Sequence, residues 1–381
     1  MRHDFKFFCI VVLATCLNFL PSLAQSSTVN AIVSGGITRS YRLYVPDIYD
    51  GTGAVPLVLN LHGLGSNAIE QEYYGDFRSI ADTANFILVA PDGTNSGLGG
   101  QFWNAFGLST PDDIGFISDL IDEVSSNFMI DQSRIYSTGM SNGGFMSYTL
   151  ACELSNRITA IASVTGSMTT LQGNLCTPSH PVPVMQIHGT ADGTVSYNGG
   201  SGLYGIEALV DYWVESNGCN TEAQFEALPD INATDGCTAE HYVYSGGIQG
   251  STVEFYKILG GDHSWPGASI NINTTNLDFN ASKEIWRFFS QYDLDQLTSI
   301  DERIRLQSEI NVYPNPSADY FFMQLGKEIS GTMSVYNEIG LLIVQENFNF
   351  GIKRFEVDAP GVYFITVKTA DQFLVKRIVK Y

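Results

Sequence analysis

Hydrophobic and polar residues between about Thr28 and Tyr292 follow two alternating patterns. Short apolar runs rich in β-branched residues, each bounded by turn residues, are typical of buried parallel strands. These runs are 56–61, 86–90, 134–138, 158–164, 182–187 and 253–259. Amphipathic stretches lie between and after them, for example at 113–128, 206–215 and 281–292. The alternation predicts an α/β domain, in which a mostly parallel sheet has helices on both faces.

The two ends of this region differ from its middle. Residues 29–34 and 38–45 are expected to form antiparallel strands at one edge of the sheet. Residues 293–310 are charged and lack turn clusters, which predicts a linker. From 311 to 381, short alternating strands follow one another with turns between them and without a helical period. That pattern predicts a small all-β sandwich after an α/β domain at 25–292.

The first residues have the three-part pattern of a secretory signal peptide. Arg2 and Lys6 precede a short apolar run from Phe7 to Leu20, and small residues follow up to Ala24, where cleavage is expected. The run is short for a membrane span, and no other stretch reaches the roughly 18 apolar residues that one needs. The sequence therefore predicts a leader at 1–24 and an exported mature protein without a membrane span.

Cleavage after the leader would leave four cysteines, which are Cys152, Cys176, Cys219 and Cys237. An even number in an exported chain predicts two disulfides, although four cysteines allow three pairings. Neighbours in sequence suggest Cys152–Cys176 and Cys219–Cys237, each worth about 3 kcal/mol on the chain-entropy model. Free buried thiols are the alternative.

Composition restricts the partners of the chain. Its 381 residues include 19 Lys+Arg against 40 Asp+Glu, a formal net charge of −21. A field of this sign repels phosphate backbones and anionic headgroups, which disfavours binding of nucleic acid and electrostatic binding to membranes. No residues have the spacing of a metal site, and we expect neither a metal nor another cofactor. Neutral or weakly charged substrates fit this composition.

A Gly-x-Ser-x-Gly motif at 139–143 follows one predicted strand directly and precedes a helical segment that starts near Phe145. The tight strand-to-helix turn of a nucleophile elbow strains the serine backbone and needs small residues on both sides. Such a turn places the Ser141 hydroxyl at the carboxyl edge of the sheet. The motif in this setting predicts a nucleophile, with an ordinary glycine-rich turn as the alternative.

A serine of this kind needs an acid and then a histidine later in the chain. Asp192 follows the predicted strand at 182–187, and His263 follows the one at 253–259. All three residues then lie at carboxyl ends of strands, where open α/β sheets bind ligands. In the expected mechanism His263 takes the Ser141 proton, and Asp192 orients and stabilises the imidazole.

Other histidines fit the role less well. Of the histidines in the mature chain only His241 and His263 follow Asp192. His241 lies in an alternating, strand-like segment, which predicts a structural role. His188, just ahead of the acid loop, is expected to be a core or hydrogen-bonding residue.

Other acids fit less well too. Asp262 adjoins His263, and neighbouring side chains in an extended loop point apart. Asp112 and Asp113 precede Ser141, which is the wrong order for this arrangement. We expect both to cap or stabilise the N-terminus of the helix at 113–128.

Backbone N–H groups are expected to form the oxyanion hole. Asn142, directly after the nucleophile, supplies one of them. The second is predicted at Leu64, because His62-Gly63-Leu64-Gly65 ends an early strand and its glycines permit close backbone approach.

Several motifs together, in this order, resemble those of the poly(3-hydroxybutyrate) depolymerase and feruloyl/acetylxylan esterase family. They are 139–144, 188–192, 261–267, 103–105, 112–116 and the spacing of Cys219 and Cys237. The resemblance covers about 28–292. It implies an α/β-hydrolase fold and a secreted serine esterase that uses Ser141, Asp192 and His263.

The end of the chain resembles the C-terminal sorting domain of type IX secretion. The matching segments are 312–317, 361–364 and 376–381. The resemblance implies the type IX machinery as a partner, passage through the outer membrane, and either release or attachment to the cell surface. A carbohydrate-binding β module is the alternative.

The expected substrate is a polymer-linked ester, namely a feruloyl or acetyl group on plant polysaccharide, with a polyhydroxybutyrate-type polyester as the alternative. The interval from Ser141 to Asp192 leaves no room for an inserted lid, which argues against a serine peptidase with a gating domain. A non-catalytic binding protein is disfavoured by the complete set of three residues. Trp103 and Trp265, which lie among polar or turn residues, are candidates for stacking on an aromatic acid or sugar.

Overall fold

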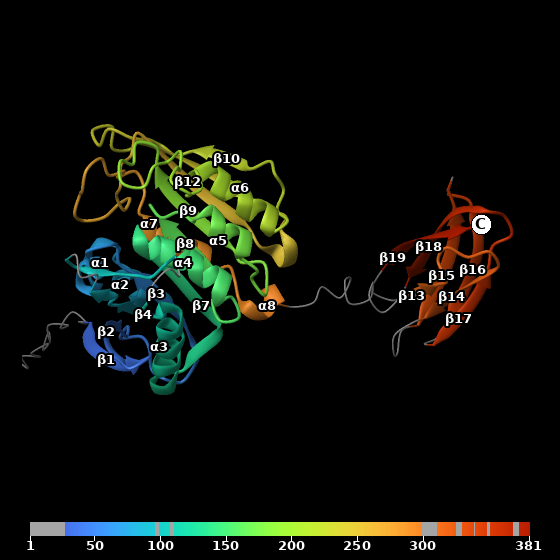
Figure 1. Ribbon diagram of the computed structural model, residues 1–381, viewed down its shortest axis with the longest axis horizontal. Helices are drawn as coiled ribbons and strands as arrows, with labels where there is room; N and C mark the ends of the chain where they lie inside the picture. Colours follow the sequence, from blue (N-terminus) through green and yellow to red (C-terminus); the bar gives the residue numbers. More distant parts are fainter. Residues whose placement is uncertain are drawn as a thin grey trace, which may run out of the picture.

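The computed structural model describes residues 27–95, 99–106, 110–298, 311–324, 330–338, 340–348, 351–368 and 373–381. The predicted leader at 1–24 lies outside these residues, as does most of the predicted linker. The described residues form an α/β unit up to residue 298 and a β unit from residue 311 (Figure 1).

Within the described residues, the α/β unit contains a ten-stranded sheet of order β1-β2-β4-β3-β7-β8-β9-β12-β11-β10. Its parallel block consists of β4 (Ile87–Pro91), β3 (Val55–Leu61), β7 (Ile130–Met140), β8 (Ala160–Val164), β9 (Val184–Gly189) and β12 (Val253–Leu259). Antiparallel strands extend both edges, namely β1 (Thr28–Ser34), β2 (Ile37–Tyr44), β11 (Thr238–Tyr244) and β10 (Gln224–Ala227). A separate pair is formed by β5 (Thr94–Asn95) and β6 (Gln101–Phe102). The predicted α/β-hydrolase fold is confirmed.

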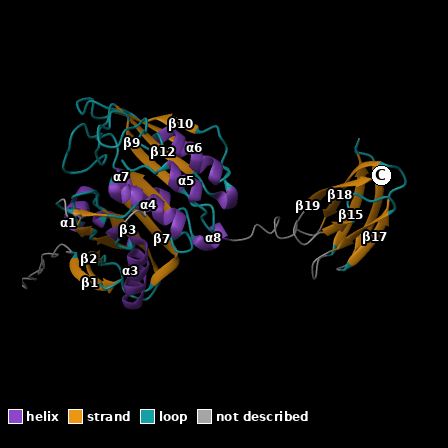
Figure 2. Cartoon of the chain, in the orientation of Figure 1, coloured by secondary structure: helices purple, strands orange, loops and turns teal. Residues whose placement is uncertain are grey.

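Successive strand residues point to opposite sides of the sheet. Both sides carry apolar side chains here, and helices cover both of them. In β3, Leu57 and Leu59 pack on one face with α3 (Asp113–Asn127), α4 (Asn142–Glu153) and α6 (Ile206–Ser216). Between them, Val58 packs on the other face with α2 (Arg78–Ala84) and α7 (Ala281–Phe289). Figure 2 shows the strands among these helices. Burial on both faces explains why the central strands are continuous apolar runs.

Short helices occupy the connecting segments. They are α1 (Ala68–Tyr74), α5 (Thr170–Leu175), η1 (Ile248–Gly250) and α8 (Leu294–Thr298). The last of these lies inside the predicted linker at 293–310. Its Leu297 is buried in the same core as α7. The folded unit therefore continues beyond Tyr292, because one leucine in a charged segment finds an apolar site.

Residues 311–381 form two small antiparallel sheets. One contains β13 (Asn311–Tyr313), β14 (Tyr320–Gln324) and β17 (Ile352–Glu356). The other contains β16 (Leu342–Phe348), β15 (Gly331–Asn337), β18 (Gly361–Lys368) and β19 (Phe373–Lys380). Side chains from both sheets, among them Phe321 and Ile365, share one core. The predicted all-β unit is confirmed, and β13 is an addition to the predicted strands.

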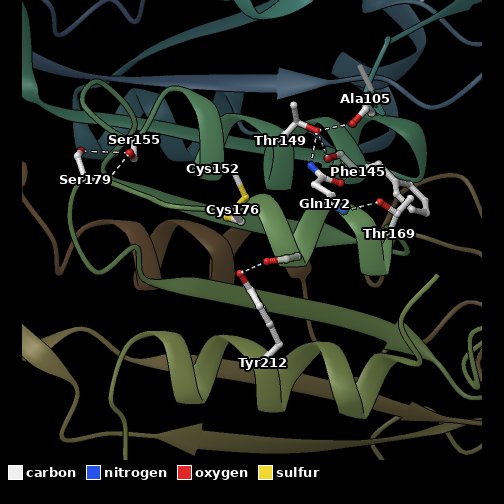
Figure 3. The surroundings of a disulfide bond; sticks show 11 residues. Ala105, Phe145, Thr149, Cys152, Ser155, Thr169, Gln172, Cys176, Ser179 and Tyr212 are labelled. Atoms are coloured by element: carbon white, nitrogen blue, oxygen red, sulfur yellow. Dashed lines mark hydrogen bonds between the residues drawn. A yellow bond between two sulfur atoms is a disulfide. The ribbon is translucent and has the colours of Figure 1, made fainter. Parts of the chain in front are cut away.

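The predicted Cys152–Cys176 disulfide is present (Figure 3). It joins the end of α4 to the residue after α5. Nearby, Gln172 Nε2 donates to Thr149 Oγ1 at 2.9 Å, and the Tyr212 hydroxyl donates to the Gly173 carbonyl at 3.0 Å. These contacts fix α5 against α4 and α6.

The predicted Cys219–Cys237 disulfide is wrong, because both residues are free, buried thiols. Cys219, just after α6, packs in the core on one face of the sheet. Cys237, just before β11, packs in the core on the other face. Burial raises the pKa of Cys219, and it raises the pKa of Cys237 to about 12. Both thiols are therefore protonated and unreactive at neutral pH.

We expect an alkylating reagent to label Cys219 and Cys237 only after denaturation, even without a reductant. Cys152 and Cys176 become labelled only when a reductant is added as well. Peptide mass spectrometry after sequential labelling reads both outcomes. A non-reduced peptide pair that contains Cys219 linked to Cys237 would contradict the structure.

Candidate active site

Ser141 lies at the turn between β7 and α4. Its φ of 52° falls in the left-handed region, where a residue with a side chain is strained. The Ser141 N–H donates to the Val164 carbonyl at the end of β8, at 2.8 Å. Because α4 begins at Asn142, the serine lies at the positive end of that helix. The turn has the strand-to-helix form that the sequence predicted.

The glycines around Ser141 are required by the backbone of β3. A Cβ on Gly139 would lie 2.5 Å from the Leu61 carbonyl oxygen, and a Cβ on Gly143 would overlap the same oxygen. A Cβ on Gly144 would lie 2.6 Å from Ser163 Oγ. The turn can therefore pack against β3 and β8 only if these positions lack side chains.

Asp192 and His263 lie after β9 and β12, which are adjacent strands. Although 71 positions separate the two residues, His263 Nδ1 lies 2.8 Å from Asp192 Oδ2. His263 lines the same pocket as Ser141, whereas Asp192 is buried. The structure thus brings the three predicted residues to one edge of the sheet.

The Asp192 carboxylate has four polar neighbours. Oδ1 accepts the N–H groups of Thr194 and Val195, each at 2.8 Å. Oδ2 lies 2.8 Å from His263 Nδ1 and 3.2 Å from His188 Nε2. Burial raises the pKa of Asp192, but the contacts with His188 and His263 outweigh burial and hold it well below its ordinary value. Asp192 is therefore ionised at neutral pH and orients His263 through Nδ1.

Leu64 and Asn142, the predicted oxyanion residues, flank Ser141 from two elements. Asn142 is the first residue of α4, and Leu64 lines the pocket with Ser141. A Cβ on Gly63 would lie only 3.5 Å from the Ser141 Cβ. The backbone of this loop therefore passes directly beside the serine.

The imidazole of His62 fixes the loop that contains Leu64. Its Nε2 accepts the Gly93 N–H at 2.8 Å, so Nδ1 carries the proton and donates to the Gly63 carbonyl at 2.7 Å. Burial lowers the pKa of His62, which favours this neutral form. In one peptide plane the C=O and the next N–H point in opposite directions. Holding the Gly63 carbonyl therefore sets the direction of the Leu64 N–H.

Trp103 and Trp265, which were expected to stack on a ligand, are buried and do not face the pocket. Each indole is about 1% exposed, so neither offers a free face. The Trp103 N–H donates to Asn142 Oδ1 at 2.6 Å, and its Nε1–H donates to the His62 carbonyl at 3.0 Å. Trp265 Nε1–H donates to Ser282 Oγ at 3.2 Å. Both residues support the loops of the site from behind.

A pocket of about 470 Å³ opens beside Ser141 and His263. Most of its wall is apolar or aromatic and comes from α1 and from the loops after β3 and β12. The residues that form this part are Leu64, Ile69, Tyr73, Tyr74, Ile270 and Ile272. Apart from Leu64, sequence reasoning missed them. The sequence contains a signal for two of them: Ile270 and Ile272 are apolar residues in a loop shortly after the His263 motif, which is typical of the wall of an apolar pocket.

The alternative histidine and acid take structural positions. Asp262 Oδ1 accepts the backbone N–H of His263 at 2.7 Å and that of Gly193 at 3.2 Å. Its carboxylate therefore helps to shape the two loops. His241 Nε2 lies 2.8 Å from Glu254 Oε2, on the antiparallel edge of the sheet.

Asp112 and Asp113, at the start of α3, have different structural roles. Asp112 is the N-cap, and its side chain accepts the Gly115 N–H. Asp113 is buried instead, and its Oδ1 lies 2.7 Å from the Arg39 guanidinium. The capping expectation holds for Asp112, whereas Asp113 forms an internal ion pair.

Within the described ranges, no group of three or more His, Cys, Asp or Glu side chains is arranged to hold a metal ion. The same part of the chain contains no helix of the length and apolar character that a membrane crossing requires.

The sheet order and the serine turn after its central strand place the protein among the α/β hydrolases. The chain is 32% identical to the probable feruloyl esterase C of Aspergillus clavatus, over 60% of this chain and 82% of that protein. It is 29% identical to feruloyl esterase D of Neurospora crassa, over 72% of this chain and 88% of that protein. The chain belongs to the feruloyl/acetylxylan esterase family and is a carboxylic ester hydrolase.

The chain is also similar to a solved structure and, over its last residues, to a second family. A solved acetyl xylan esterase from Aspergillus awamori aligns with a TM-score of 0.49 and 14% identity, over 69% of this chain and 99% of that chain. Residues 311–381 match the family described as the secretion system C-terminal sorting domain. The sorting-domain prediction is therefore confirmed.

Gly143→Ala is expected to destabilise the elbow by about 1–3 kcal/mol, because the new Cβ meets the Leu61 carbonyl. Ester hydrolysis should fall with it, since the turn carries Ser141. Urea unfolding measures the first effect and turnover of a soluble ester the second. Gly53→Ala is the control, because a Cβ there has no neighbour within 4 Å. Equal stability of the two variants would contradict the packing described for the turn.

Proposed function

We propose that this protein is an exported serine esterase that releases aromatic acyl groups of the feruloyl type from plant polysaccharide. Ser141 is the nucleophile, His263 the general base and acid, and Asp192 the carboxylate that orients the imidazole. The backbone amides of Leu64 and Asn142 form the oxyanion hole. The observation that carries the proposal is the pair formed by Asp192 and His263 beside Ser141, at the mouth of an apolar pocket.

In this mechanism His263 Nε2 accepts the Ser141 proton while Oγ attacks the ester carbonyl. Asp192, already ionised, stabilises the imidazolium through Nδ1–H. The amides of Leu64 and Asn142 stabilise the oxyanion, each lowering the barrier by about 3 kcal/mol. His263 then gives this proton to the ester oxygen of the sugar as the C–O bond breaks, so that the sugar leaves as an alcohol. Water repeats the sequence on the acyl-enzyme and releases the acid.

The size and lining of the pocket support an aromatic acyl group. An acetyl group needs only a few tens of Å³, far less than the roughly 470 Å³ beside Ser141. Ile69, Tyr73, Ile270 and Ile272 offer apolar and aromatic surface to a planar ring. The relatives named feruloyl esterase favour the same reading.

Export agrees with a polymeric substrate. The sorting domain at 311–381 indicates an extracellular or cell-surface location. A polysaccharide is too large to enter a cell, so an esterase that acts on it has to be outside. The leader predicted at 1–24 fits the same route.

The direct test compares release of ferulate, acetate and 3-hydroxybutyrate by the purified protein from feruloylated arabinoxylan, acetylated xylan and polyhydroxybutyrate. We expect ferulate to be released fastest. Ser141→Ala should lower kcat by on the order of a millionfold, because it removes the nucleophile. Predominant release of 3-hydroxybutyrate would favour a polyester depolymerase, and no turnover of any ester would refute the proposal.

A variant that fills the pocket tests the acyl site itself. Ile69 is 51% exposed, so Ile69→Trp is compatible with folding, yet it narrows the pocket. We expect kcat/KM for methyl ferulate to fall at least about tenfold, the cost of one lost apolar contact region. Hydrolysis of acetylated xylan should change little. Ile231→Trp, at an exposed site outside the pocket, is the control. Equal loss on both substrates would contradict this placement of the acyl group.

A further inference from the structure

A second histidine contacts the acid of the site. His188 lies near the end of β9 and is completely buried. Its Nε2 lies 3.2 Å from Asp192 Oδ2 and 2.9 Å from the Val195 carbonyl. Asp192 Oδ2 is thus shared between two imidazoles, because His263 Nδ1 approaches the same oxygen at 2.8 Å. The sequence predicted His188 only as a core or hydrogen-bonding residue.

The hydrogen-bond partners of His188 determine which ring nitrogen carries the proton. Gln186 Nε2 donates to the Gly166 carbonyl at 2.9 Å, and Gln186 Oε1 accepts the Tyr148 hydroxyl at 2.7 Å. These two contacts fix the amide, so its nitrogen also faces His188 Nδ1, at 3.0 Å. His188 Nδ1 therefore accepts, and Nε2 carries a proton that is hydrogen-bonded to the Val195 carbonyl and lies beside Asp192 Oδ2.

We propose that His188 is a positioning residue for the esterase reaction, which holds Asp192 in place by donating its Nε2 proton toward Oδ2. The inference rests on the proposed function, since it assigns a role behind the proposed catalytic groups. A carboxylate that is bonded to backbone only at Oδ1 can still swing its other oxygen. A second donor at Oδ2 limits that motion and keeps Oδ2 directed at His263.

The same contact moderates how strongly Asp192 attracts the His263 proton. Two imidazoles lie against one oxygen, His263 at 2.8 Å and His188 at 3.2 Å, so part of the negative charge on Oδ2 is stabilised by His188 as well as by His263. Loss of the His188 donor would leave that charge to His263 alone. The Asp192–His263 pair would then hold its proton more tightly, and the acidic limb of the kcat/KM profile would move to higher pH.

Other titratable groups around this pair do not produce that change. Tyr148 of α4 donates to Gln186, which contacts His188, and the ring centre of Tyr197 lies 6.2 Å from that of His188. Burial raises the pKa of both tyrosines, so they stay neutral in the working range. Asp262 directs its Oδ1 to backbone N–H groups. The pH profile therefore reports on His263 and its partner Asp192.

The experiment compares His188→Leu, which removes the donor, with His188→Gln, whose amide can still donate toward Asp192. We expect the leucine variant to lose about tenfold to a hundredfold in kcat, the range for one hydrogen bond to a charged group. KM should stay nearly unchanged, and the acidic limb should move to higher pH. The glutamine variant should recover most of the lost kcat.

His180→Leu is the matched control, because His180 is also buried but bonds the carbonyls of Ser155 and Pro181, away from the acid. It should destabilise the protein without moving the pH profile. Equal kinetic effects of the two leucine variants would overturn the positioning role. Should His188→Leu fail to fold, Gln186→Leu removes the amide that fixes the tautomer, and the same loss of kcat is expected.

A spectroscopic readout separates this inference from the proposed function. The His263 Nδ1 proton, held between nitrogen and carboxylate, should give a downfield proton NMR resonance in the wild type. The resonance should shift or broaden in His188→Leu or Gln186→Leu and return toward its position in His188→Gln. An unchanged resonance in either leucine variant would overturn the role of His188, even if the esterase is active. Absent ester turnover with the predicted shift would instead refute only the proposed function.

Discussion

A buried negative charge on Asp192 is the constraint on which the site depends. An ionised carboxylate without partners is costly to bury, and the usual outcome is that it takes up a proton. Here backbone amides at Oδ1 and two imidazoles at Oδ2 compensate for the lost water. These donors come from β9 and from the loops that follow β9 and β12. The carboxylate can therefore stay charged only if the sheet places those two strands side by side.

The same sheet fixes Ser141, the proposed nucleophile, by a second constraint, which is steric. The turn after β7 packs so closely on the Leu61 carbonyl that Gly139 and Gly143 cannot carry side chains. This close approach also brings the loop after β3, with Leu64, beside Ser141. Ser141, the loop that contains Leu64 and the Asp192–His263 pair thus reach one edge because each follows a parallel strand of one block.

The sequence sufficed for the fold and for the placement of Ser141, Asp192 and His263. The turn that contains Ser141 could be recognised because its glycines and its serine lie within five consecutive residues. The order of acid and histidine follows the order of the strands, which the apolar runs predicted well. Each inference needed only neighbours in sequence or the rule that ends of parallel strands share an edge.

The sequence could not show on which face of the sheet a residue packs, or in which direction its side chain points. Cys219 follows α6 on one face, whereas Cys237 lies two positions before Ala239 on the other, so their closeness in sequence misled. Trp103 lies among polar neighbours, yet its indole turns inward to the His62 carbonyl. The contact of His188 with Asp192 likewise arises from a loop that folds back on its own strand.

Covalent labelling with a fluorophosphonate shows whether Ser141 and His263 converge in one site. The reagent phosphonylates an activated serine with loss of fluoride, and peptide mass spectrometry identifies the modified residue. We expect one adduct, on Ser141, in the wild type, and a labelling rate reduced by orders of magnitude in His263→Ala. An adduct on another serine, or equal labelling of Ser141 with and without His263, would contradict this convergence.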